Sequence, residues 1–179
     1  MARERRAVPP DIEAPGPEGD RVRAEVGRRA YDLNVQQYAC VGLNFGYFYD
    51  QSPLIAYDGE AAPGYSMGSF VPSTVPGCRT PWYRLPDGRS LYDVLGPDYA
   101  LLRFDPTIDA APLVDAAAHR GVPLRIVDLD RATRPAEYRH DLVLSRPDQH
   151  VAWRGDSLPP DPLALIDRIR GAGPAVETR

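Results

Sequence analysis

The sequence contains no lysine, no long apolar run and only two cysteines. No stretch of its 179 residues approaches the roughly 18 consecutive apolar residues of a membrane span. No apolar run follows Met1, as a secretory signal peptide requires. We therefore expect a cytoplasmic protein with no membrane partner.

The charge of the chain is weakly acidic. All 21 basic residues are arginine, against 25 acidic residues, so the formal net charge is −4. The only basic cluster, which consists of Arg3, Arg5 and Arg6, lies at the start of the chain. An acidic chain without a basic stripe is a poor binder of nucleic acid, and we predict no such partner.

The two cysteines exclude the common cysteine motifs. Cys40 and Cys78 form neither a CxxC redox pair nor a paired-ligand zinc pattern. We expect both to be buried or half-buried thiols. A disulfide is not expected in a reducing compartment.

The length suits one domain of ordinary size, for which roughly 100 to 200 residues are typical, and leaves no room for a multidomain enzyme. Four prolines mark residues 1–19, which we predict to be a disordered tail, and residues 173–179 form a second tail. An amphipathic helix is expected from Asp20, because Val22, Val26, Ala30 and Leu33 recur at helical spacing.

Residues 20–87 are predicted to hold this linker helix and a connection rich in aromatic residues and proline. Short runs of aromatic and β-branched residues predict strands at Phe45–Tyr49, Leu54–Tyr57 and Trp82–Leu85. Residues 61–80 are expected to be mostly loop. Such segments often lie across the surface of a neighbouring element.

Regular patterns fill residues 88–172. A short helix begins at Ser90 and ends at Gly96, and a final helix begins at the cap Asp161 and ends at Gly171. The elements expected between them are a strand at 99–104, a helix from the cap Asp109 to Gly121, strands at 123–129 and 141–145, a turn at Pro147–Asp148 and a returning strand at 149–154. The order β-α-β and then β-β-α predicts an α/β fold with a thioredoxin-like mixed sheet flanked by helices.

The sequence does not carry the redox chemistry of that fold. A reactive dithiol would stand after the first strand, at the start of its helix, where the thiol pKa is lowered. That place holds residues 105–112, which contain no cysteine. No GxGxxG follows a strand, and no phosphate-binding GxxxxGK[ST] is present, so the chain shows no cofactor site of its own.

Other motifs do not carry a site either. Asp128 and Asp130 follow a strand and suit a divalent ion, but they more often cap a loop. The three histidines, His119, His140 and His150, lie on separate elements. Residues 64–68 match GxSxG as a string without the strand and helix that a nucleophile elbow requires. We assign no catalytic, cofactor-binding or metal-binding residue.

Longer strings carry a specific resemblance. PGCRTPWYRLPDGRSLYDVLG (76–96), LLRFDP (101–106), AAAHRGVPLRIVD (116–128) and LVLSRPDQHVAWRGD (142–156) resemble the C-terminal region of FAD-dependent aromatic-ring monooxygenases, the class of phenol, 3-(3-hydroxyphenyl)propionate and polyketide hydroxylases. The resemblance extends over residues 20–172. One departure is Trp82, where members of the family often have histidine.

The resemblance implies a thioredoxin-like domain without redox cysteines, which packs on a flavin domain and in some members contributes to a dimer. It also implies that FAD and NAD(P)H serve the full-length relatives. The flavin motifs would lie before Asp20, where this sequence has only 19 residues. We therefore expect that the chain is not catalytic alone and requires a flavin-binding domain in cis or in trans, with a homodimer as a further possibility.

Two hypotheses follow. In the first, the chain is a structural and interaction module of an aromatic hydroxylase, as a fragment or a separate gene product. In the second, it is a free-standing binding protein for aromatic or carboxylate ligands, which Arg79, Arg84 or Arg103 would hold. The aromatic residues of the connection suit interface anchors or a cover for the sheet edge, and these are Tyr47, Phe48, Tyr49, Tyr65 and Trp82.

Overall fold

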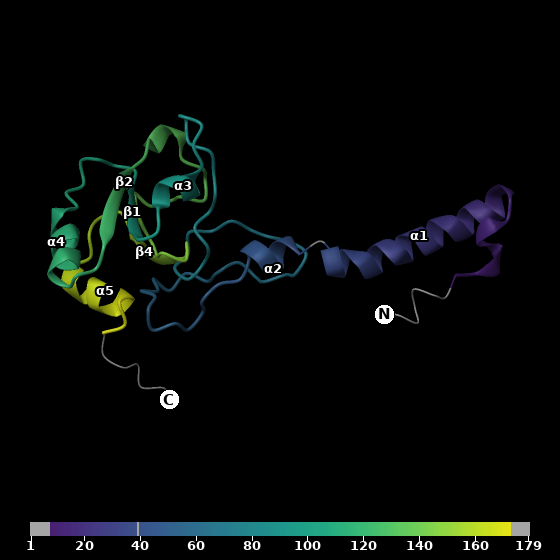
Figure 1. Cartoon of the computed structure of the whole chain (residues 1–179), viewed down its shortest axis with the longest axis horizontal. Helices are drawn as coiled ribbons and strands as arrows, with labels where there is room; N and C mark the ends of the chain where they lie inside the picture. The colour runs from purple at the N-terminus through teal and green to yellow at the C-terminus, as the bar shows by residue number, and fades with distance from the viewer. Residues whose placement is uncertain (1–7, 39, 173–179) are drawn as a thin grey trace. The chain divides into compact units, whose positions relative to one another are not determined.

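The structure is a computed structural model that describes residues 8–38 and 40–172. The chain divides into two compact units. The N-terminal unit comprises Met1–Gly46 and Tyr65–Phe70, and the sheet unit comprises Tyr47–Gly64 and Val71–Arg179. Figure 1 shows both units. The predicted tail at residues 173–179 and the first seven residues of the predicted tail at 1–19 lie outside the described residues.

A four-stranded mixed sheet forms the centre of the sheet unit. β1 (Tyr99–Arg103) pairs in parallel with β2 (Leu124–Asp128), and β3 (Leu142–Ser145) pairs antiparallel with both β1 and β4 (Val151–Gly155). The strand order is β2-β1-β3-β4. The parallel pair is joined through a helix, as a parallel connection requires. This confirms the predicted thioredoxin-like mixed sheet.

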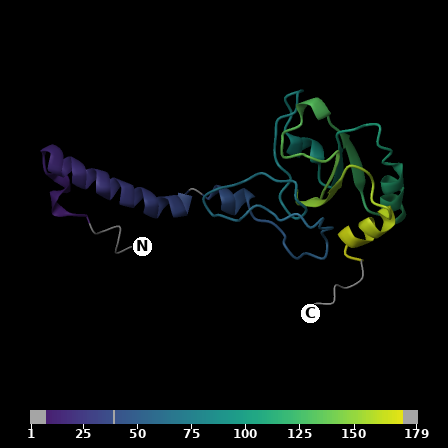
Figure 2. The same cartoon turned by 180° about the vertical axis from the view of Figure 1, so that it is seen from behind.

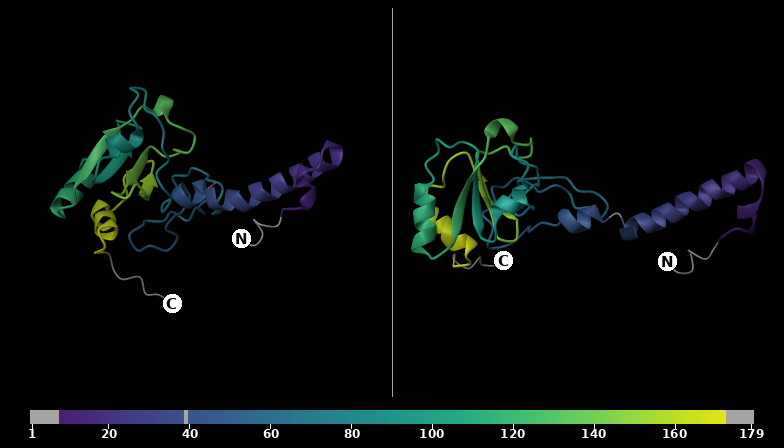
Figure 3. Two further views of the ribbon diagram at one scale, coloured as in Figure 1. Left: turned by 45° about the vertical axis from the view of Figure 1, so that its right-hand side comes forward. Right: turned by 45° about the horizontal axis from the view of Figure 1, so that its top comes forward.

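Helices cover the two faces of the sheet. α4 (Ala111–His119) and α5 (Pro162–Ile169) pack on one face, and α3 (Leu91–Leu95) lies on the other, as Figures 1, 2 and 3 show from different sides. Successive residues of β1 alternate between the two faces, because side chains of a strand point to opposite sides. Leu101 joins the core under α4 and α5, whereas Ala100 and Leu102 join the core under α3.

Side-chain caps fix the helix starts. Asp161 accepts a hydrogen bond from the Ala164 amide at the start of α5, and Ser90 accepts one from the Tyr92 amide at the start of α3. These two caps confirm the predictions. The expected cap Asp109 instead accepts from the Ala111 amide, and Ala110 is the residue that directly precedes α4.

The N-terminal unit contains η2 (Pro10–Glu13), α1 (Gly16–Tyr38) and α2 (Val41–Phe45). The prediction of a disordered tail up to residue 19 is wrong, because η2 lies within that range and α1 begins four positions before Asp20. Arg23 donates hydrogen bonds to two carbonyl oxygens of residues 12 and 14, which holds η2 against α1. Gly19 permits this contact, because a Cβ there would lie 1.7 Å from the Ala14 carbonyl oxygen.

The three strands predicted in the connection are wrong. Phe45 ends α2, and no strand forms in residues 46–49, 54–57 or 82–85. Residues 54–57 contact the sheet through isolated hydrogen bonds, as when the Ala56 amide donates to the Ala152 carbonyl oxygen. In residues 82–85, Arg84 forms only an isolated bridge with Ser90. Residues 77–80 lie beside β4, where the Gly77 amide donates to the Val151 carbonyl and the Val151 amide to that of Cys78. The connection therefore covers the β4 edge of the sheet.

Candidate functional site

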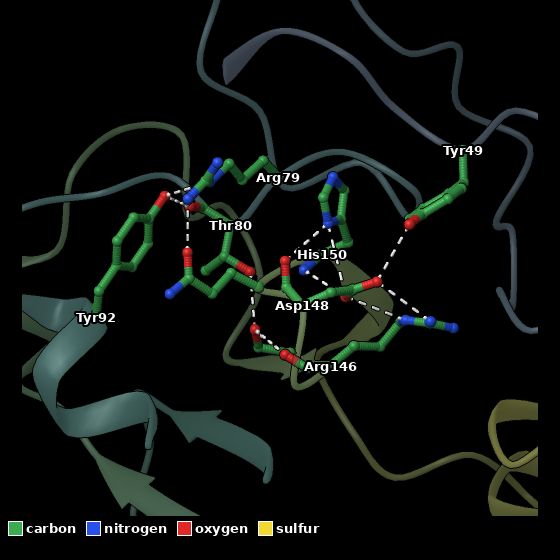
Figure 4. Close-up of polar contacts among 9 residues, drawn as sticks. Tyr49, Arg79, Thr80, Tyr92, Arg146, Asp148 and His150 are labelled. Carbon is green, nitrogen blue, oxygen red and sulfur yellow. Dashed lines mark hydrogen bonds and ion pairs between the residues drawn. The ribbon is translucent and has the colours of Figure 1, made fainter. Parts of the chain in front are cut away.

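The turn between β3 and β4 gathers polar side chains from distant parts of the sequence. The Gln149 amide donates to the Arg146 carbonyl oxygen at 2.9 Å, with Pro147 and Asp148 at the centre, as predicted. Gln149 has a φ of 65°, in the left-handed region that few non-glycine residues adopt. This conformation turns the backbone so that residues 146, 148 and 150 face one cluster (Figure 4).

Asp148 is the acceptor at the centre of this cluster. Its carboxylate accepts from the Arg146 guanidinium, from the Tyr49 hydroxyl and from the His150 amide, each at 3.2 Å. Burial works to raise the pKa of Asp148, but the donors from His150 and Arg146 outweigh it and hold this pKa well below its usual range. Asp148 is therefore a fixed negative charge at neutral pH.

His150 lies fully buried beside it. The Nδ1 atom is 3.0 Å from the Asp148 carbonyl oxygen, which can only accept, so Nδ1 carries the proton in this contact. The imidazole lies between the rings of Tyr47 and Tyr49, with centroid distances of 5.0 and 4.9 Å. Arg146 lies over Tyr49, 5.6 Å from its centroid. These contacts fasten the start of the connection to the hairpin.

The other half of the cluster joins the connection to α3. Arg79 donates to the Tyr92 hydroxyl at 3.2 Å and to the Gln149 side-chain oxygen at 2.7 Å. The Tyr92 hydroxyl donates to the Thr80 carbonyl oxygen at 2.8 Å, and the Thr80 and Ser145 hydroxyls lie 3.0 Å apart. In the described part of the chain, the hydrogen bonds of the Thr80 and Ser145 hydroxyls involve no histidine or carboxylate. This arrangement therefore positions segments and offers no activated nucleophile.

Only one of the three arginines considered as ligand-holding residues lies in this cluster. Arg79 is there, whereas Arg84 is exposed and donates to the Gly88 carbonyl oxygen. Arg103 is bound to Asp128 through two of its nitrogens and to the Ile108 carbonyl oxygen through the third. The three residues do not form a common site.

The carboxylate pair after β2 has structural partners. Asp128 binds Arg103, and Asp130 accepts from the Ala132 amide at the start of η3 (Arg131–Thr133). Within residues 8–38 and 40–172, no group of three or more histidine, cysteine or acidic residues is arranged to hold a metal ion. Both cysteines are free thiols, Cys40 half-buried and Cys78 buried, and burial raises the pKa of Cys78.

The aromatic residues of the connection serve different purposes. Tyr47 and Tyr49 clasp His150, and the indole of Trp82 donates to the Ser90 hydroxyl at 2.8 Å. Tyr65 belongs to the N-terminal unit, where it is exposed. The sequence identified Asp148 only as a turn residue, since its contact with Tyr49 spans 99 positions and no local pattern indicates it.

The β1–α4 connection is where a fold with a β-α-β unit would bind a nucleotide phosphate. Residues 104–110 contain no glycine. The Asp105 carboxylate accepts from the Thr107 amide there, and the Asp109 carboxylate from the Ala111 amide. A phosphate would meet these negative charges rather than free amides. Residues 104–110 therefore do not fit the phosphates of FAD or of a nicotinamide dinucleotide.

None of the helices in the described part of the chain is both long enough and apolar enough to cross a bilayer.

Comparison with known proteins gives one consistent result. The family described as "Aromatic-ring hydroxylase, C-terminal" matches residues 73–172. The phenol 2-monooxygenase of Pseudomonas sp. (strain EST1001) is 31% identical over 177 residues, which cover 87% of this chain and 28% of that protein. The FAD-dependent monooxygenase opdD of Penicillium oxalicum is 29% identical over 156 residues, covering 82% of this chain and 29% of that protein.

A solved structure matches the fold over nearly the whole chain. RebC, in a crystal soaked with chromopyrrolic acid and with 7-carboxy-K252c bound, superposes with a TM-score of 0.78 at 35% identity, over 94% of this chain and 32% of RebC. The chain thus spans less than a third of the length of the relatives that it matches. The matched residues make up more than half of the chain, and they include β1 to β4, α3 to α5 and the polar cluster apart from Tyr47 and Tyr49. The chain belongs to the family of aromatic-ring hydroxylase C-terminal domains.

Proposed function

We propose that the chain is the structural and interaction module of an FAD-dependent aromatic hydroxylase, and that it is not catalytic alone. The observation that carries this proposal is the extent of the match: 94% of this chain corresponds to 32% of RebC. The flavin chemistry then belongs to a flavin-binding portion, in the same polypeptide or in another, and the complete enzyme would use FAD and NAD(P)H in the cytoplasm.

Exposed apolar side chains in the N-terminal unit support an interaction role. Those of α2 and of residues 65–67 are 41% to 51% exposed and comprise Val41, Leu43, Phe45, Tyr65 and Met67. Large apolar side chains gathered in one small unit are typical of interaction surfaces. The Gly42 and Leu43 amides both donate to the Met67 carbonyl oxygen, so the two segments that carry these residues are held together.

The polar cluster at the β3–β4 turn supports the same role. Its side chains are engaged with one another, so that it joins residues 47–49, 79–80 and 92 to the hairpin. Such a cluster orients a connection and does not transform a substrate. The absence of a fitting phosphate site in residues 104–110 agrees with a flavin bound elsewhere in the enzyme.

The visible absorption spectrum of the purified chain tests the proposal. We expect no flavin band, and no oxidation of NAD(P)H above the rate without protein, when FAD and phenolic substrates are added. A yellow protein that oxidises NAD(P)H would contradict it.

A second candidate function is the binding of a small aromatic carboxylate, and Arg79 is the residue that favours it. The guanidinium lies 5.3 Å from the Tyr92 ring centroid and is half-buried. A thermal shift with millimolar phenolic acids that is lost in Arg79→Gln but retained in Arg84→Gln would support this function. No shift for the unmodified chain would exclude it under these conditions.

A further inference from the structure

Both ends of one long loop lie in the sheet unit and meet at a single buried arginine. Residues 61–73 connect Glu60 with Thr74 without a helix or a strand. Arg154 of β4 binds the Asp58 carboxylate through Nε at 2.7 Å and the Glu60 carboxylate through Nη2 at 2.5 Å. Its Nη1 atom donates to the Thr74 hydroxyl at 3.3 Å. Every nitrogen of the guanidinium thus contacts one end of the loop.

The burial of these groups is uneven. The Arg154 side chain is only 1% exposed, whereas those of Asp58 and Glu60 are 31% and 43% exposed. A planar guanidinium with donors in fixed directions suits such a bridge, since lysine offers one compact charge at a single point. The fixed strand therefore supplies the arginine, and the loop supplies the partners.

Neighbouring groups reinforce the contacts. Glu60 also accepts from Arg139, and the Thr74 hydroxyl donates to the Glu137 carbonyl oxygen at 2.9 Å. The hydrogen bond from Arg139 and the one from Arg154 lower the pKa of Glu60. Burial works to raise the pKa of Asp58, but Arg154 and the Glu60 amide bring it below its usual value. Both carboxylates are therefore charged at neutral pH.

We propose that Arg154 is a positioning residue that closes the base of this loop, because it holds Asp58 and Glu60 at the start of the loop beside Thr74 at its end. Residues 65–70 of the loop belong to the N-terminal unit, in which Tyr65 and Met67 are exposed. The base of a loop that carries apolar side chains is thus held closed by one residue of β4. This role is independent of whether the chain binds a flavin-containing partner.

The rate at which chymotrypsin cleaves the whole chain measures how readily the loop opens. Tyr65 and Phe70 are suitable cleavage sites, and mass spectrometry identifies the products. Arg154→Lys keeps the charge but reaches only one end. We expect cleavage at these two sites to be about tenfold faster, the ratio that corresponds to a loss of about 1.4 kcal/mol in loop closure. Urea unfolding of the same variant measures how much global unfolding contributes to the cleavage rate.

Arg103→Lys is the matched control. Arg103 also binds a carboxylate and a carbonyl oxygen through three nitrogens, with a side chain that is 17% exposed, but its partners Asp128 and Ile108 are outside the loop. We expect it to leave cleavage at Tyr65 and Phe70 unchanged. Equal rates for Arg154→Lys and the unmodified chain would overturn the proposal. The proposal would also be overturned if the cleavage rate of Arg154→Lys rose only in proportion to its equilibrium constant for global unfolding.

Milder variants decide the matter if Arg154→Lys does not fold. Asp58→Asn weakens the start of the loop and Thr74→Val its end. Each should accelerate cleavage, and the double variant should cleave no faster than the faster single variant, because release of one end already opens the loop. Rates that multiply in the double variant would show that the two ends are held independently, and the proposal would fail.

Discussion

At the residue scale, Asp148 shows how one carboxylate joins segments that are distant in the sequence. It binds Arg146 and His150 within the hairpin and Tyr49 across 99 positions. Only the hairpin part follows from local rules, since Pro147 and Asp148 are typical of a turn centre. The contact with Tyr49 depends on how the connection crosses the sheet, which no pattern in the sequence specifies. Arg154 was missed for the same reason, because its partners lie 80 to 96 positions away.

Asp148→Asn should destabilise the sheet unit at neutral pH. The native pKa of Asp148 lies below that of an unfolded aspartate, which is about 3.9, so its stabilisation is present above about pH 4 and is lost as the pH falls further. We expect a loss of about 1 kcal/mol at pH 7, after allowance for partial exposure, and a smaller loss at pH 3. Urea unfolding at both values measures it. Asp98→Asn, at an exposed position, is the control. If Asp148→Asn lost the same unfolding free energy at pH 3 as at pH 7, the prediction would be contradicted.

Two substitutions of His150 separate the contribution of ring packing to stability from that of hydrogen bonding. His150→Phe retains a ring between Tyr47 and Tyr49 but removes the Nδ1 donor, so we expect it to cost about 1 kcal/mol. His150→Ala also leaves a cavity in a fully buried place and should cost about 3 kcal/mol. Thermal or urea unfolding compares the two variants. Equal losses would mean that the clasp by the two tyrosines adds nothing.

At the element scale, the sequence identified the strands and helices of residues 88–172 because each carries its own signals. A buried apolar run such as residues 99–103 specifies a strand, and Ser90 and Asp161 cap their helices as expected. The aromatic connection has similar composition to a strand, yet it bonds to β4 by single contacts such as that of Ala56 with Ala152. Composition reports that a segment suits a sheet surface. It does not report whether a neighbouring strand offers a free edge in register.

The cap of α5 gives a prediction at this scale. Asp161→Ala removes the acceptor for the Ala164 amide, which lies 2.9 Å from the Asp161 carboxylate, and should lower stability by about 1 kcal/mol. Asp161→Asn keeps an acceptor and should lose much less. Urea unfolding measures both variants, and equal effects would indicate that charge rather than capping is responsible.

At the scale of the whole molecule, the exposed apolar residues of the N-terminal unit are the feature that most needs a partner. The family resemblance raised a homodimer as one form of partnership. We predict that the isolated chain self-associates through this surface and that Leu43→Glu with Met67→Glu prevents it, because charges in an apolar contact are costly to bury. Sedimentation equilibrium over a range of concentrations measures the association.

Ala118→Glu places a glutamate at an exposed position of α4 and serves as the control for this experiment. We expect it to self-associate as the unmodified chain does. A chain that remains monomeric at every concentration, or a dimer that survives both glutamates, would contradict the prediction. The first result would leave the flavin-binding portion as the expected partner of this surface.

The cover that residues 77–80 form over β4 has a consequence for aggregation. A sheet grows by adding strands at an open edge, and the described connection already occupies the edge of β4. Growth is then confined to β2, where Arg125 and Asp128 are exposed and place opposite charges along a short strand. Neutral substitutions at these two positions would therefore remove the charges that protect the remaining edge from pairing with a second copy of the chain.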